Sequence, residues 1–159
     1  MSAAVPPLGP LLLVCSCGGH LMQLVALRDA WGAFDRVWVT FDKGDARALL
    51  AGERVVRAYG PTNRSLRNLL RNLRLARRVL GTVRPSAVLT TGAGVAVPFA
   101  WLAHLRGVPV VYVESFTRIE GLSLSGRLIA PAADRLFVQW PEASSGPRAR
   151  YAGDLVSDR

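Results

Sequence analysis

The residues best suited to chemistry stand in a short turn after the first apolar run of the sequence. They are a serine, two glycines and a histidine: Ser16, Gly18, Gly19 and His20. The glycines permit a tight turn, and the helix predicted to begin here presents free N–H groups that suit a phosphate or diphosphate. His20 could donate a hydrogen bond or act as a general base. The alternative is a plain strand-to-helix turn with Ser16 as its cap.

Two further loops carry candidate residues. Gly92 and Gly94 separate an apolar run from a helical segment, either as a second anion-binding turn or to allow close packing. Glu114 ends a strongly apolar run, so its carboxylate is expected to be solvated, paired with an arginine such as Arg118, or directed at a substrate hydroxyl. Arg118 could instead hold a phosphate through two parallel hydrogen bonds.

Apolar runs of strand length alternate with segments of helical period. We predict strands near 10–16, 36–41, 54–59, 86–91, 108–115 and 134–140, and helices near 21–31, 65–83 and 95–105, with a short one ending at 50. This alternation indicates an α/β fold, a Rossmann-like parallel sheet with helices on both faces. Ligands of such sheets bind beyond the carboxyl ends of the strands, so we expect the three candidate loops to face one crevice.

The predicted helix 65–83 carries arginines at steps of three and four, which places them on one face. They are Arg64, Arg67, Arg71, Arg74 and Arg78, and the residues expected on the other side are Leu66, Leu69, Leu73, Ala76 and Leu80. Two interpretations are open: a solvated face on a core-packed helix, or arginines that meet an anionic membrane surface while flanking leucines enter the lipid interface. We favour the membrane over nucleic acid, because no aromatic residues interleave with the arginines.

Composition supports one folded domain over residues 1–159, with a flexible lead at 1–10 and a polar tail at 142–159. Half of the 159 residues are hydrophobic and 19% are charged, which is not the composition of a disordered chain. The net charge is +9, and Lys43 is the one lysine, so arginine carries it and an anionic partner is implied.

Several classes of site and protein are disfavoured. No apolar run reaches the length that spans a bilayer, and neither the GxGxxG nor the GxxxxGK[ST] pattern occurs. Cys15 and Cys17 are too close in sequence to favour a disulfide or a zinc site, so we expect a reducing compartment. No metal or cofactor is expected.

Four motifs occur in the order found in one known family: SCGGH, TTGAGVAVPF, VYVESFTRIEGLSLSGRL and ADRLFVQWPE…YAGDL. The chain resembles the membrane-associated subunit of the two-component N-acetylglucosaminyltransferase that extends dolichol-diphosphate-linked sugar. It is most similar to the bacterial exopolysaccharide counterparts of the PssD/EpsE type, and more distantly similar to the amino-terminal half of the GT-B enzyme MurG. The resemblance covers about 11–155.

The resemblance implies which residues bind the acceptor. Gly18, Gly19 and His20 would contact its diphosphate, and Gly92 and Gly94 would form a second acceptor loop. Glu114 matches a carboxylate near the acceptor sugar, and His20 is the candidate general base, or else acts by charge alone. The UDP-sugar would bind a separate small catalytic subunit, since no donor half follows YAGDLVSDR.

The predicted function is the acceptor-binding and activating subunit of an inverting hexosyltransferase, inactive alone. It would transfer a sugar from a UDP-sugar to a polyprenyl-diphosphate-linked sugar, at the cytoplasmic face of the inner membrane. Eukaryotic family members carry an amino-terminal membrane anchor that this sequence lacks, so attachment would be peripheral, through the arginine helix. The alternatives are a non-catalytic scaffold that recruits a competent partner, and a stand-alone nucleotide-binding protein, which the missing GxGxxG disfavours.

Overall fold

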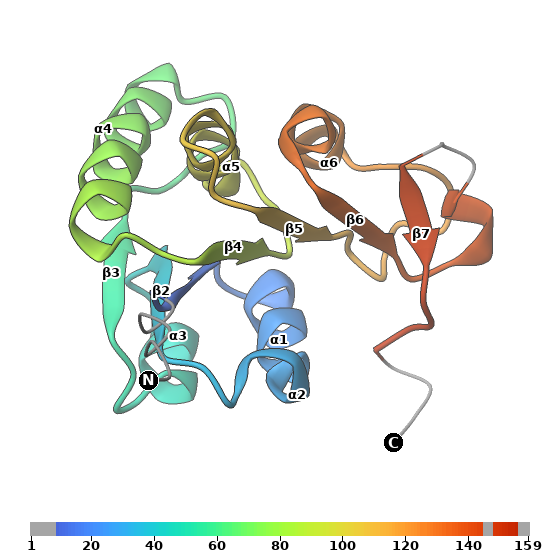
Figure 1. Cartoon of the computed structure of the whole chain (residues 1–159), viewed down its shortest axis with the longest axis horizontal. Coiled ribbons are helices and arrows are strands. Elements are labelled where there is room, and N and C mark those ends of the chain that lie inside the picture. Colours follow the sequence, from blue (N-terminus) through green and yellow to red (C-terminus); the bar gives the residue numbers. More distant parts are fainter. Residues whose placement is uncertain (1–8, 145–147, 156–159) are drawn as a thin grey trace, which may run out of the picture.

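Short apolar strands form one parallel sheet in the computed structural model, which describes residues 9–144 and 148–155 (Figure 1). The strands are β1 (Leu11–Val14), β2 (Arg36–Phe41), β3 (Val55–Ala58), β4 (Ala87–Thr90), β5 (Val110–Val113), β6 (Arg135–Val138) and β7 (Ala149–Tyr151). Their order is β3-β2-β1-β4-β5-β6-β7, and each neighbouring pair is parallel. All carboxyl ends therefore lie at one edge, where such sheets bind ligands.

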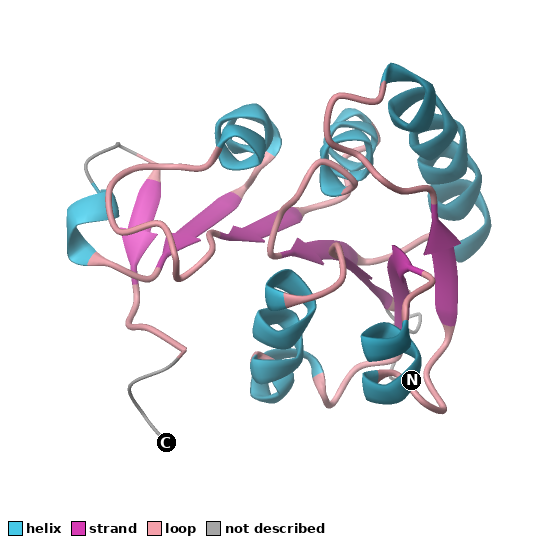
Figure 2. Ribbon diagram, turned by 180° about the vertical axis from the view of Figure 1, so that it is seen from behind, coloured by secondary structure: helices cyan, strands magenta, loops and turns pink. Residues whose placement is uncertain are grey.

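Helices connect the strands and cover both faces of the sheet (Figure 1 and Figure 2). One face carries α1 (Gly19–Ala26), α2 (Arg28–Trp31) and α3 (Gly44–Leu49). The other carries α4 (Leu66–Val83), α5 (Ala96–Leu105) and α6 (Leu124–Ile129). Short 3₁₀ helices span Ala130–Ala132 and Pro141–Ser144. The predicted Rossmann-like fold with helices on both faces is confirmed.

Each face of the sheet buries its own apolar core, because successive strand residues point to opposite faces. In β1, Leu12 and Val14 pack in the cluster that contains Phe99 of α5. Leu13 and Cys15 pack in the cluster on the α1 side. Burial raises the pKa of the Cys15 thiol to about 12, so this cysteine is a core residue rather than a reactive one.

The helix predicted near 21–31 is divided in the structure. α1 ends at Ala26 and α2 begins at Arg28. The indole Nε1 of Trp31 donates to the carbonyl oxygen of Leu24 at 2.8 Å, and this carbonyl is the one that an uninterrupted helix would pair with the N–H of Arg28. The buried tryptophan thus takes the place of one helical hydrogen bond, and the helix breaks there.

The polar tail predicted at 142–159 is partly wrong. Residues 149–151 form β7, which pairs with β6 in the register Leu136↔Ala149 and Val138↔Tyr151. A short edge strand is held by backbone hydrogen bonds and needs no apolar pattern, so the sequence did not reveal it. The short helix α6 was likewise not predicted. Residues 145–147 and 156–159 of this tail, and 1–8 of the predicted lead, lie outside the described residues.

Gly92 occupies a position that excludes a larger side chain. Its φ of +100° lies in the left-handed region, and a Cβ at this site would approach the Tyr112 ring to 3.0 Å. We expect Gly92→Ala to lower the free energy of unfolding by about 1–3 kcal/mol, measured by chemical denaturation.

The matched control is Gly81→Ala within α4, where an added Cβ meets nothing within 4 Å. There the substitution removes backbone entropy from the unfolded chain, so stability should rise by about 0.5–1 kcal/mol. Equal effects at both positions would contradict the steric account of Gly92.

Candidate functional site

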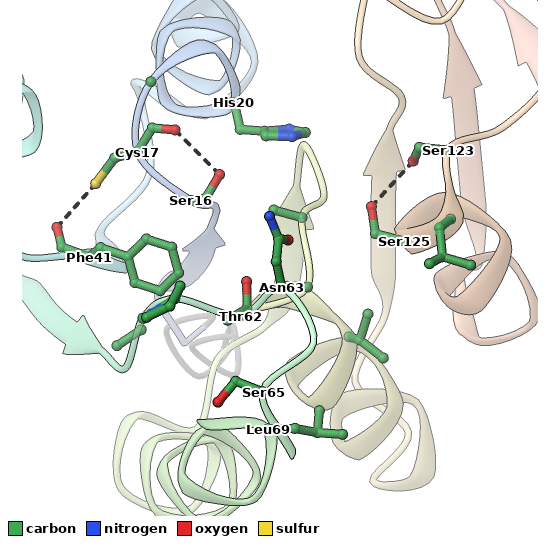
Figure 3. Close-up of a pocket in the computed structure, with 18 of the residues that line it drawn as sticks. Ser16, Cys17, His20, Phe41, Thr62, Asn63, Ser65, Leu69, Ser123 and Ser125 are labelled. Carbon is green, nitrogen blue, oxygen red and sulfur yellow. Dashed lines mark hydrogen bonds between the residues drawn. The ribbon is translucent and has the colours of Figure 1, made fainter. Parts of the chain in front are cut away.

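A cleft of about 1580 Å³ opens along the carboxyl edge of the sheet. It is lined by the loops that follow β1, β2, β3, β4 and β5. In Figure 3, Ser16 and His20 lie on one side, Ser123 and Ser125 on another, and Asn63 between them. The prediction that three loops face one crevice is confirmed.

Some of the residues predicted to bind the diphosphate or to act in catalysis line the cleft, and others lie behind its surface. Those that line the cleft are Ser16, Gly18, His20, Gly94 and Arg118. Gly19 and Gly92 belong to the same turns but are not among the lining residues, and Glu114 is fully buried.

Two hydrogen bonds between His20 and Thr91 join the loop after β1 to the loop after β4. The Nδ1 of His20 lies 2.7 Å from the carbonyl oxygen of Thr91, and the hydroxyl of Thr91 donates to the carbonyl oxygen of His20 at 2.7 Å. A carbonyl can only accept, so Nδ1 must carry the proton. In the neutral ring Nε2 is therefore left with its lone pair, and the ring extends toward the middle of the cleft (Figure 3). His20 is thus arranged to accept a proton or a hydrogen bond.

The turn at the start of α1 offers free amide groups, but one is already occupied. Gly18 has a φ of +73°, and its N–H donates to Oδ2 of Asp45 at 2.7 Å. This bond lowers the pKa of the Asp45 carboxyl. The N–H groups of Gly19, His20 and Leu21 have no acceptor among the described residues, and Met22 is the first whose N–H bonds back, to the oxygen of Gly18. The turn therefore already binds one anionic group, the Asp45 carboxylate, through the N–H of Gly18. The three N–H groups that follow can donate to a second anionic group.

The second glycine turn packs closely around its neighbours. The N–H of Gly92 donates to Oγ1 of Thr90 at 2.9 Å, and a Cβ on Gly94 would approach Thr62 to 3.1 Å. Between them Ala93 adopts a φ of +70°, an uncommon conformation for a residue with a side chain. Close packing thus accounts for both glycines, and their role in anion binding stays a prediction.

The carboxylate of Glu114 is buried and fully engaged in hydrogen bonds. Oε1 accepts from the N–H of Ser115 at 2.8 Å, and Oε2 accepts from the N–H and hydroxyl of Ser123 at 2.8 and 2.9 Å. Burial and this neighbouring carboxylate raise the pKa of Tyr112. Glu114 does not pair with Arg118, and its geometry fits a residue that folds the loop from 115 to 123. A catalytic role for Glu114 stays a prediction.

Unpaired cations give the cleft a positive character. Lys43, Arg64 and Arg118 line it, and none of them has a carboxylate partner among the described residues. Two carboxylates also line the cleft. The carboxylate of Asp42 pairs with Arg47 at 2.7 Å and with Arg57 at 2.9 Å, and the hydrogen bond from Arg47 together with the charge of both arginines lowers the pKa of Asp42. The carboxylate of Asp45 accepts from the N–H of Gly18. The remaining charge favours an anionic ligand.

Arg64 does not belong to the arginine face on which the sequence places it. α4 begins at Leu66 after the N-cap Ser65, so Arg64 precedes the helix, with a φ of +54°. It lines the cleft instead. The other predicted members, which are exposed on α4, are Arg67, Arg71, Arg74 and Arg78.

Four leucines in the first half of α4 do not face the core. The exposed fractions of Leu66, Leu69, Leu70 and Leu73 are 70%, 41%, 46% and 40%. Asn68 and Asn72 are buried in their place. The amide of Asn72 donates to the carbonyl of Tyr59 at 2.8 Å and accepts from its N–H at 2.9 Å, so it completes the backbone pairing beyond β3. The five residues predicted to lie opposite the arginines therefore do not share one environment, since Leu66, Leu69 and Leu73 are exposed whereas Ala76 and Leu80 are buried.

Residues that sequence reasoning missed include Asp45 and Gln23. Gln23 carried a usable signal, because it is a polar residue on the otherwise apolar face of α1. Asp45 gave none, and neither did the contact between Thr91 and His20, since these hydrogen bonds join residues 27 and 71 positions apart. Among the described residues no cluster of three or more His, Cys, Asp or Glu could hold a metal ion. No helix in that same part is long and apolar enough to cross a membrane.

A protein-family profile described as "Oligosaccharide biosynthesis protein Alg14 like" matches residues 54–155. This segment is more than half of the chain, and it contains the loops after β3, β4 and β5. The chain belongs to the Alg14-like family. The matched segment begins after the first glycine turn.

Named relatives of this Alg14-like chain are subunits of one enzyme. The "UDP-N-acetylglucosamine transferase subunit ALG14" of Mus musculus is 28% identical over 179 residues, which cover 92% of this chain and 82% of that protein. The protein of the same name from Cryptococcus neoformans is 40% identical over 74 residues, 43% of this chain and 32% of that protein. In the latter alignment this chain spans about a third of its relative.

Solved structures share the fold of the Alg14-like chain. MurG of Acinetobacter baumannii superposes with a TM-score of 0.72 at 17% identity, covering 89% of this chain and 45% of MurG. UDP-GlcNAc 2-epimerase of Methanocaldococcus jannaschii gives a TM-score of 0.67 at 12% identity, with 91% and 45% covered. At these identities the likeness shows a shared Rossmann-like architecture, equal to less than half of either enzyme.

Removing the charge of Asp45 should strengthen anion binding at the first turn. The substitution Asp45→Asn keeps an oxygen that can accept from Gly18 but removes a negative charge beside the free N–H groups. We expect the affinity for inorganic pyrophosphate, measured by calorimetry at low salt, to rise by about two- to fivefold.

The control is Asp35→Asn, the same change in charge at the amino-terminal edge of β2. It should leave the affinity almost unchanged, because this exposed carboxylate lies at the edge of the sheet opposite to the turn, where distance and the high dielectric constant of water weaken its effect on a bound anion. A pyrophosphate affinity that is equal in wild type and Asp45→Asn would mean that the anion binds elsewhere.

Proposed function

We propose that this chain is the acceptor-binding subunit of a two-component glycosyltransferase. The complex would transfer a sugar from a UDP-sugar to a polyprenyl-diphosphate-linked sugar during polysaccharide synthesis. The observation that carries the proposal is the pair of hydrogen bonds between His20 and Thr91, which holds two turns beside one cationic cleft. The names of the Alg14 relatives, each called a subunit of a UDP-N-acetylglucosamine transferase, support a partner subunit, to which we assign the donor site.

The diphosphate of the acceptor would lie across the first turn. The free N–H groups of Gly19 and His20 would donate to it, and Arg118 would bind it from the opposite wall. The hydroxyl of Ser16, which donates to the carbonyl oxygen of Cys17 at 3.3 Å, would have to turn to the diphosphate to join them. Arg64 extends the cationic lining and joins this set. Gly18 shapes the turn through its positive φ, since its own N–H is held by Asp45.

His20 is the proposed general base. Its Nε2 would take the proton from the acceptor hydroxyl while that oxygen forms a bond to the anomeric carbon of the donor sugar. The bond from that carbon to the UDP oxygen breaks at the same time, and the configuration inverts. The bond between Nδ1 and Thr91 fixes the tautomer that this step requires.

Peripheral membrane attachment would bring the cleft to its lipid-linked acceptor. α4 exposes leucines beside arginines, the composition of a helix that lies in the lipid interface. Leu66 and Leu69 are exposed and also line the cleft, so the apolar surface continues into the site. We propose the cytoplasmic face of the inner membrane as the location. The bacterial exopolysaccharide setting stays a prediction, since the relatives compared above are a mammal and a fungus.

A non-catalytic scaffold is the second candidate. It is favoured by the burial of Glu114, which removes the predicted carboxylate from the cleft surface. On that hypothesis the partner holds the complete catalytic machinery, and this chain supplies only the attachment of α4 to the membrane.

Transfer to a synthetic polyprenyl-diphosphate sugar distinguishes the two candidates. With the donor-site partner present, His20→Ala should lower turnover by about a hundredfold to ten-thousandfold, the usual contribution of a general base. His104→Ala is the matched control, because this histidine is exposed on α5 and does not line the cleft.

Complex formation should be intact in both variants, checked by size-exclusion chromatography. Turnover that is unaffected by His20→Ala would favour the scaffold. Turnover by this chain without a partner would overturn the two-component proposal.

Membrane attachment should depend on the arginines of α4. Replacing Arg67, Arg74 and Arg78 with glutamine removes three exposed charges, each worth about 1 kcal/mol near an anionic surface, so binding should fall roughly a hundredfold. The measurement is co-sedimentation with phosphatidylglycerol-containing vesicles.

The control replaces Arg28, Arg54 and Arg135, which are also exposed but lie outside α4. It should retain most of the binding. Similar losses in the two triple variants would show that net charge, rather than α4, drives attachment.

A further inference from the structure

One buried amide joins the helix after the first turn to the loop after β5. Gln23 is 6% exposed and lies one helical turn beyond Gly19. Its Nε2 donates to the carbonyl of Gly19 at 3.2 Å and to the hydroxyl of Ser115 at 3.3 Å. Its Oε1 accepts from the N–H of Phe116 at 3.0 Å and from Nε2 of Gln139 at 2.8 Å. Both donors and both acceptor positions of the amide are thereby used.

Gln139 extends the cluster across the next strand. It is 3% exposed, and its Nε2 also donates to the backbone carbonyl of Glu114 at 2.9 Å. Its Oε1 accepts from the N–H of Leu155 at 3.1 Å. The cluster therefore ties the first turn, the end of β5 and residue 155 to one another through side-chain amides.

These bonds connect two walls of the cleft. One wall is the turn that ends at His20, and the other is the loop from 115 to 123, which carries Arg118. Within the described residues, the hydrogen bonds that connect α1 to this loop are the two made by Gln23, to Ser115 and to Phe116. A ligand that bridges His20 and Arg118 needs both walls at a fixed separation.

We propose that Gln23 is a positioning residue that sets the separation of these two walls. It does not line the cleft, so it acts through His20 and Arg118 rather than on a ligand. A glutamine suits the position because the site needs two donors and two acceptors on one planar group. The proposal rests on the proposed function only in naming the ligand that the walls hold, a polyprenyl diphosphate.

Amide hydrogen exchange of the full chain tests the coupling directly. We expect Gln23→Leu to raise exchange by about tenfold in both 22–26, the hydrogen-bonded part of α1, and 115–122, because both segments lose the same anchor. Gln23→Glu keeps acceptors for Phe116 and Gln139 but loses the two donors, so it should give a smaller rise in the same segments.

The control is Asn72→Leu, which removes another buried amide with two backbone hydrogen bonds. Its effect should be confined to the backbone near Tyr59, and exchange in 115–122 should not change. Unchanged exchange at 115–122 in both Gln23 variants would overturn the proposal.

Affinity for farnesyl diphosphate adds a readout that simple destabilisation would not move. At matched thermal stability, Gln23→Leu should weaken binding by about tenfold, with Gln23→Glu intermediate. The control for affinity is Asp134→Ala, which loses the hydrogen bond to the N–H of Val110 at the opposite edge of the sheet and should bind as wild type does. Loss of affinity in Asp134→Ala as large as in Gln23→Leu would refute the positioning role. If the wild-type chain itself fails to bind the probe, the proposed function fails, while the exchange pattern still decides whether Gln23 couples the walls.

Discussion

The reciprocal hydrogen bonds between His20 and Thr91 are the contact on which the cleft depends. They exist because β1 and β4 are adjacent parallel strands, paired in the register Val14↔Thr90, so that both chains leave the sheet at the same height. The contact joins the two glycine turns and also fixes the proton of His20 on Nδ1. The pairing of β1 with β4 thus sets both the position of His20, the candidate base, and the ring nitrogen that carries its proton.

Electrostatics in the cleft follow from which charges are already paired. The carboxylates near the site are engaged: Asp42 by two arginines, Asp45 by an amide and Glu114 by Ser115 and Ser123. The cations on its wall have no such partners among the described residues. Three of the cations behind the chain's net charge of +9 therefore stand on the cleft wall, with free amide groups beside them.

α4 links this polar cleft to an apolar surface. Its buried positions include Asn68 and Asn72, whose amides serve the backbone after β3, and this arrangement turns Leu66 and Leu69 toward solvent and the cleft. A ligand with an anionic head and a hydrocarbon chain would find suitable surface for both parts. The proposed membrane role and the proposed acceptor role thus depend on the same helix.

The sequence by itself determined the Rossmann-like sheet, its strands up to β6, and the turns that carry His20, Gly94 and Arg118. These features follow from the hydrophobic period, from the position of the glycines and from the alternation of strands and helices along the chain, all of which can be seen in short stretches of sequence. The tertiary structure alone decided that Glu114 is buried, that Arg64 joins the cleft, that asparagines replace leucines in the core, and that Gln23, Asp45 and Thr91 support the first turn. These outcomes depend on hydrogen bonds between residues far apart in sequence, and the energy of leaving a buried polar group unpaired selects partners that no local pattern encodes.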